Sequence, residues 1–173
     1  MDMIKEFTIP FVGLKPGKHH FEFSIDDTFF AHFEFNDFDQ ASLKGQLTLD
    51  KKTSFLELHF EIRGPIVLAC DVSTELFSYP METAFDLIVK FGVPPDNPAD
   101  EILVLPVGSY QIDVSHYFYE MAVLALPRKR IHPGIKDGSL ESEIVERLKA
   151  LEPKETHLNG SEDPRWNKLK DLL

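Results

Sequence analysis

The clearest pattern in the chain is a strict alternation of apolar and polar residues between positions 56 and 63. Its apolar positions are Leu56, Leu58, Phe60 and Ile62, and its polar positions are Glu57, His59, Glu61 and Arg63. Because successive side chains of a strand point to opposite faces, this alternation predicts a strand with one buried and one solvated face. Gly64-Pro65 then predicts a break in the chain. The apolar run 66–70 that follows predicts a second strand, covered on both faces.

Further strands are predicted on either side of this central stretch. After the polar segment 71–75, a third strand at 81–91 places its apolar residues on one face, and the short connections favour an antiparallel meander. Pro10 makes 7–14 an edge strand or an extended arm, because proline cannot donate to a ladder. Alternation or short apolar runs predict the remaining strands at 20–25, 43–49 and 102–105.

Helical spacing appears at four places. Asp26 and Asp27 can cap a short helix carrying Phe29, Phe30 and Phe33, and Ser139 can cap a helix that Pro153 ends. Asp163-Pro164 is a strong start for a final helix, with Trp166, Leu169 and Leu172 on one face. The most distinct helix begins at Asp113 and ends before Pro127, with an apolar face of Val114, Tyr117, Phe118, Met121, Leu124 and Ala125.

These elements predict an α+β fold. We expect an antiparallel sheet or partial barrel of about six strands, with flanking helices and a helical C-terminal region. We expect one domain overall, with a β-rich core at 1–133 that includes the helix at 113–126, and a helical extension at 134–173.

Composition narrows the possible functions. The chain is 43% hydrophobic and has fifteen Phe, which is enough for a core. Its formal net charge of -11 repels nucleic-acid phosphates at long range, so an RNA contact requires a local basic patch or a protein partner. No apolar run approaches the roughly 20 residues that span a bilayer, and the N-terminus lacks the apolar core of a signal peptide. We therefore expect a soluble, cytoplasmic protein without a membrane partner.

The residues give little sign of catalysis. Cys70 is the only cysteine and ends an apolar run, which favours a core position over a nucleophilic one. No G-x-S-x-G, P-loop or G-x-G-x-x-G motif is present. The seven histidines do not form a ligand pair on a predicted helix. We therefore predict no catalytic residue, cofactor, metal site or small-molecule substrate.

A basic cluster follows the helix at 113–126 in this otherwise acidic chain. Basic residues after a helix end complement its dipole, which explains one or two of them but not the whole cluster. The cluster therefore indicates contact with phosphate or an acidic partner. In the predicted terminal helix, the aromatic and basic residues indicate either packing or docking onto a partner. The candidate RNA- or partner-binding residues are Arg128, Lys129, Arg130, His132, Arg165 and Trp166.

Three blocks of the sequence together resemble the YceD family, whose members are called large ribosomal RNA subunit accumulation proteins. The first block runs from Ile62 to Asp71, the second from Ile112 to His132, and the third from Asp163 to Leu172. The residues that carry the resemblance include Gly64, Cys70, Asp71, Glu120, Pro127, Asp163 and Pro164. The resemblance implies a role in 23S ribosomal RNA accumulation or processing and in large-subunit assembly. It supplies no catalytic residues, because none are established for the family.

The chain departs from the family pattern at its cysteines. Many relatives carry a second cysteine where this chain has Ser73, and some carry a further cluster where 154–162 has none. A metal site of such relatives is therefore not expected here.

Three hypotheses follow from the residues and the resemblance. The first is a non-enzymatic ribosome-biogenesis factor that binds ribosomal RNA precursor, a ribosomal protein or an assembly protein. The second is a protein-binding module that uses a sheet edge or the terminal helix. The third is a metal-dependent RNA hydrolase, which requires a carboxylate cluster.

Overall fold

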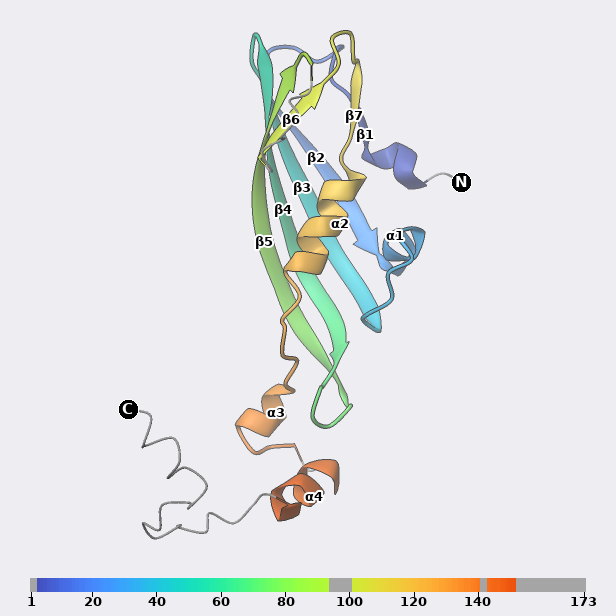
Figure 1. Ribbon diagram of the computed structural model, residues 1–173, viewed down its shortest axis with the longest axis vertical. Coiled ribbons are helices and arrows are strands. Elements are labelled where there is room, and N and C mark those ends of the chain that lie inside the picture. The colour runs from blue at the N-terminus through green and yellow to red at the C-terminus, as the bar shows by residue number, and fades with distance from the viewer. Residues whose placement is uncertain (1–2, 94–100, 141–142, 152–173) are drawn as a thin grey trace, which may run out of the picture.

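The computed structural model describes residues 3–93, 101–140 and 143–151, and it has the α+β architecture that the sequence predicts (Figure 1). Its elements are η1 (Met3–Phe7), β1 (Thr8–Pro10), β2 (Gly17–Asp26), α1 (Asp27–His32), β3 (Gln40–Lys51), β4 (Phe55–Ala69), β5 (Leu76–Phe91), β6 (Ile102–Leu105), β7 (Gln111–Asp113), α2 (Ser115–Leu124), α3 (Pro133–Lys136) and α4 (Glu143–Leu151). No helix in these ranges has the length and apolar character needed to cross a membrane.

Five strands form one long open sheet in the order β2-β3-β4-β5-β6, and β1 pairs with β7 in a separate two-stranded sheet. The first four strands of the long sheet form the predicted antiparallel meander. The expectation of a purely antiparallel sheet is wrong, because β6 runs parallel to the last four residues of β5. The two strands pair over only four residues, so the chain has to run back only about 13 Å along β5 before β6 begins.

The alternation in the sequence separates the two faces of the sheet as predicted. Leu56, Leu58, Phe60 and Ile62 are buried, whereas the polar residues between them are exposed or half-buried. Helix α2 crosses the buried face (Figure 1), and its Phe118 is fully buried with its ring centroid 5.2 Å from that of Phe60. A fully buried phenylalanine is a large apolar anchor, so this contact fixes the helix on the sheet.

The predicted break at Gly64-Pro65 is wrong, because β4 continues without interruption from Phe55 to Ala69. Gly64 adopts a φ of +150°, which favours glycine, and Pro65 faces Pro80 while pairing with β5 continues. The pairing with β3 is interrupted instead, between the Lys44–Arg63 pair and the Ala41–Ile66 pair. Pro65 lies in this gap, where its lack of a backbone N–H breaks no hydrogen bond between the strands. The second half of β4 is also buried on one face only, since Ile66 and Leu68 are buried whereas Ala69 is exposed.

The helices follow the predicted starts more closely than the predicted faces. Asp26 caps α1 by accepting hydrogen bonds from the backbone N–H groups of Thr28 and Phe29, at 3.0 and 3.1 Å. Asp113 accepts from the backbone N–H of Ser115 at the start of α2, at 2.9 Å. The assignment of Leu124 to the apolar face is wrong, because this side chain is 84% exposed where no described element covers the end of α2.

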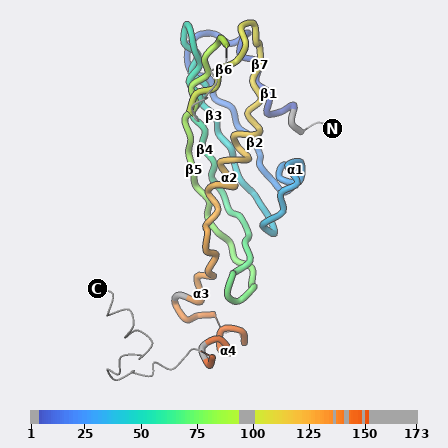
Figure 2. The backbone as a smooth tube through the Cα atoms, viewed as in Figure 1, coloured from blue at the N-terminus to red at the C-terminus, as the bar shows by residue number. Residues whose placement is uncertain are grey.

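Beyond α2 the chain runs to α3 and α4, which lie past the end of the sheet where β4 and β5 are joined (Figure 2). The predicted helix between Ser139 and Pro153 is confirmed as α4, whereas the short helix α3 was not predicted. The predicted terminal helix, with Asp163, Pro164, Arg165 and Trp166, lies outside the described residues. The division into a core at 1–133 and an extension at 134–173 stays a prediction.

Candidate functional site

The predicted basic loop, residues 128–132, runs from the end of α2 to the turn between β4 and β5. Arg130 binds the loop to this turn. The backbone N–H of Arg130 donates to the Asp71 carboxylate at 2.7 Å, and its carbonyl accepts from the backbone N–H of Asp71 at 2.8 Å. Its guanidinium donates to the Asp37 carbonyl at 2.9 Å and forms an ion pair with the Asp37 carboxylate. The bond to Asp37 raises the pKa of Arg130 above its ordinary value. Arg130 therefore joins three segments that are far apart in the sequence.

His132 also makes contacts within the protein. Its backbone N–H donates to Cys70 Sγ at 3.3 Å, and its Nδ1 accepts from the backbone N–H of Gly134 at 3.0 Å. Its ring lies edge-on to Phe77 with the centroids 5.6 Å apart. By contrast, Arg128 and Lys129 are exposed, and neither side chain has an ion pair or hydrogen bond with another described residue. The cluster of four candidates thus separates into two anchored residues and two exposed ones.

Cys70 is the centre of the turn that receives this loop. It is buried, at 2% exposure, as the apolar run predicts. Its sulfur accepts from the backbone N–H groups of Val72, Ser73 and His132 at 3.3–3.5 Å. Burial raises the pKa of Cys70, but the Ser73 hydroxyl and these N–H donors outweigh burial and lower the pKa to about 7. Sequence reasoning missed this set of donors; its only signal was the Cys-x-x-Ser spacing.

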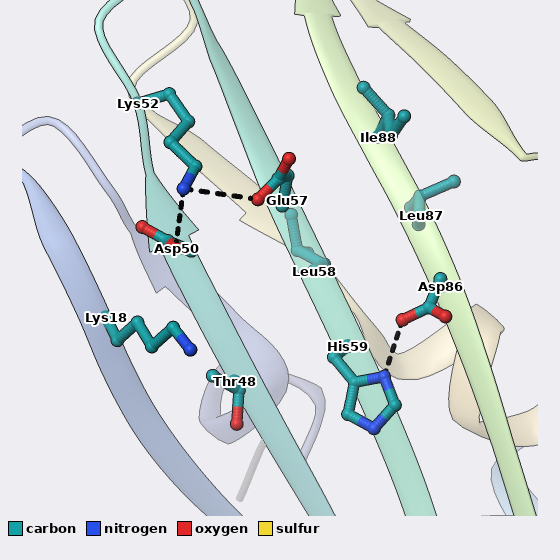
Figure 3. Close-up of a pocket in the computed structure, with 10 residues that line it drawn as sticks. All are labelled: Lys18, Thr48, Asp50, Lys52, Glu57, Leu58, His59, Asp86, Leu87 and Ile88. Carbon is teal, nitrogen blue, oxygen red and sulfur yellow. Dashed lines mark hydrogen bonds and ion pairs between the residues drawn. The ribbon is translucent and has the colours of Figure 1, made fainter.

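The polar face of the sheet carries a second feature, which the sequence analysis did not single out. A hollow of about 570 Å³ crosses β2 to β5, and most of its charged residues lie in ion pairs or hydrogen bonds with one another, whereas Lys18 has none drawn (Figure 3). Lys52 reaches Asp50 at 2.8 Å and Glu57 at 3.4 Å. His59 hydrogen-bonds to Asp86, and this bond, opposed by partial burial, raises the pKa of His59. The lining holds no Phe, Tyr or Trp side chain on which a nucleic-acid base could stack, and its one aromatic ring is the imidazole of His59, which is bonded to Asp86.

A third feature is an open groove between α2 and β5, of about 470 Å³, lined by Phe85, Tyr117, Tyr119, Glu120, Val123 and Leu124. The rings of Tyr117 and Phe85 stack with their centroids 6.4 Å apart and their planes 16° apart. Burial, together with the charge of Glu120, raises the pKa of Tyr117. Glu120, a residue of the family resemblance, pairs with His116 at 2.9 Å. The groove thus has an apolar floor and an acidic rim.

Two further residues of the resemblance, Gly64 and Pro127, lie within the described residues. Gly64 lies against the backbone of β3, where a side chain would clash with the Ser42 carbonyl oxygen, and Pro127 is half-buried just after α2. Within the described residues, no three His, Cys, Asp or Glu side chains lie close enough together to hold a metal ion.

The family model described as "Large ribosomal RNA subunit accumulation protein YceD" matches residues 58–173. This match covers more than half of the chain, including the Cys70 turn, the basic loop and α2, so the chain belongs to this family. Comparison with curated proteins and with solved structures finds no match.

Proposed function

Because the chain belongs to the YceD family, we propose that it is a non-enzymatic ribosome-biogenesis factor that acts by binding a basic protein of the assembling large subunit. The family match over 58–173 carries this proposal, since the family description names accumulation of large-subunit ribosomal RNA. A factor that supports RNA accumulation has to bind the RNA or a protein that accompanies it, and the charge of the chain bears on which of these it binds.

A basic protein partner fits the net charge of the chain. The chain carries 29 acidic and 18 basic side chains, which favours encounter with cationic partners and disfavours encounter with RNA phosphates. Arg130 is already neutralised by Asp37, so it is not available for phosphate. The cationic groups Lys52 and His59 of the polar face are likewise paired with carboxylates.

Direct binding of ribosomal RNA precursor is the second candidate, and the exposure of Arg128 and Lys129 supports it. Affinity capture from native lysate, with and without ribonuclease, separates the two candidates. Ribosomal proteins that stay bound after ribonuclease support the protein partner. Loss of both RNA and proteins on ribonuclease treatment would show RNA to be the primary ligand. Capture of neither would contradict the proposed role.

Substitutions in the basic loop test the contribution of its basic residues to the stability of the fold. Arg128→Ala with Lys129→Ala should change the free energy of unfolding by no more than about 0.5 kcal/mol per residue, since both are exposed. Arg130→Ala should lower it by about 1–2 kcal/mol, because charge-assisted hydrogen bonds are lost. Denaturant titration gives the free energies of unfolding.

Salt titration of the double variant then decides the role of the exposed pair. If Arg128 and Lys129 contact phosphate, their loss should weaken RNA binding and reduce the slope of log affinity against log salt by about one per contact. Unchanged RNA affinity in the double variant would remove these two residues from the binding surface. Equal stabilities of the Arg128→Ala and Arg130→Ala variants would contradict the anchoring role of Arg130.

A further inference from the structure

The groove between α2 and β5 exposes apolar surface that a folded protein ordinarily covers. Leu124 is 84% exposed at its edge, and Phe85, Tyr117 and Val123 are only partly buried. Grooves of this kind, formed between a helix and a sheet, receive the apolar face of an amphipathic helix. An occupant would therefore have apolar residues at helical spacing, with basic residues beside them to meet Glu120.

We propose that this groove is the docking site for the C-terminal segment 163–172 of the same chain. That segment lies outside the described residues, but its sequence has the required pattern. Trp166, Leu169 and Leu172 repeat every three residues after the Asp163-Pro164 start, which places them on one face of a helix.

Charge favours the same pairing of segment and groove. The segment carries Arg165, Lys168 and Lys170 next to its apolar face. The groove presents Glu120, whose carboxylate is about half exposed and shares its charge only with His116 among described residues. A basic side chain brought to this rim would gain Glu120 as a partner, and this exposed pair would orient the segment while the apolar contact supplies most of the binding.

The chain between α4 and the segment is comparable in length with the distance along the sheet that it has to span. Phe85 lies nine residues along β5 from Leu76, which is about 30 Å from the end of the sheet nearest α4. The twelve steps from Leu151 to Asp163 extend to about 40 Å. Because the segment is tethered, it binds at an effective concentration far above that of a separate peptide, so a small groove is sufficient.

The single tryptophan of the chain gives a direct test in the full-length protein. Trp166 fluorescence in the wild type should be blue-shifted and resistant to acrylamide quenching, as for a buried indole. Leu124→Asp should shift the emission to the red and raise quenching several-fold. Val107→Asp is the matched control, since Val107 is 83% exposed in the loop between β6 and β7, and it should change neither property.

Two fluorescence results would overturn the proposal: wild-type emission typical of an indole in water, or a Leu124→Asp variant that is indistinguishable from the wild type. Circular dichroism confirms that each variant is folded. A cysteine pair gives an independent reading if Leu124→Asp unfolds. Under mild oxidation, Leu124→Cys with Leu169→Cys should form an intramolecular disulfide, whereas Val107→Cys with Leu169→Cys should not. Equal cross-linking in both pairs would refute the docking. The proposal does not rest on the proposed function.

Discussion

Replacing Gly64 with alanine should be among the most damaging small changes in this protein. A Cβ atom at Gly64 would lie 2.4 Å from the carbonyl oxygen of Ser42 and 2.9 Å from Cα of Leu43. Both are backbone atoms of the paired strand β3, so neither can rotate away as a side chain can. The φ of +150° is an added strain, because L side chains rarely adopt that conformation.

The size of the loss follows from these two effects. Overpacking in a well-packed region costs about 1–3 kcal/mol, and a residue held in a sparsely populated backbone conformation costs about 1–3 kcal/mol. We therefore expect Gly64→Ala to lower the free energy of unfolding by about 4 kcal/mol. With a urea slope of about 2 kcal/mol per molar, the midpoint of unfolding should fall by about 2 M.

Two other glycines separate the two causes. Gly108 has a φ of +96° and no atom within 4 Å of a Cβ, so Gly108→Ala tests backbone strain alone. At Gly45 a Cβ would meet Phe118 at 2.8 Å and Ile25 at 2.9 Å, but only through side chains that can shift. Each control should lose about 1–3 kcal/mol, and all three variants share the same entropic gain in the unfolded state.

Urea unfolding followed by circular dichroism measures all three variants under identical conditions. The reasoning is refuted if Gly64→Ala loses no more stability than the Gly108→Ala or Gly45→Ala variant.

Two further predictions concern titrating groups. Asp86→Asn should lower the pKa of His59, which NMR titration of the imidazole measures, because the hydrogen bond to Asp86 holds this pKa above 6.5. A raised histidine pKa stabilises the fold below the unfolded-state pKa and ceases to do so above the folded-state pKa. The wild type should therefore exceed the variant in stability at pH values below the unfolded-state pKa of about 6.5, and this difference should vanish as the pH rises through the folded-state pKa. Equal stabilities in acid would contradict this. Ser73→Ala should raise the pKa of Cys70 from about 7 toward 9.0, because a hydrogen bond to the sulfur is lost. Ultraviolet absorbance of the thiolate against pH measures this shift, and an unchanged titration would show that Ser73 has no role in it.

Local sequence patterns determined much of the architecture. Alternation identified the buried and solvated faces of β3, β4 and β5, since a strand projects successive side chains to opposite sides whatever its partners are. Asp26 and Asp113 indicated the starts of α1 and α2, because a carboxylate satisfies free N–H groups within a few residues. These interactions are short-range, so the sequence around each position contains the information.

The structure decided the features that depend on distant partners. Gly64-Pro65 is a break signal locally, yet the paired strands on both sides carry β4 through it. The sequence placed Leu124 on the apolar face of its helix, but burial also depends on what covers each position, and no described element covers Leu124. The basic loop was recognised from its composition. That Arg130 is an anchor follows from Asp37 and Asp71, 93 and 59 residues away, because these contacts depend on separation in space and the sequence records only separation along the chain.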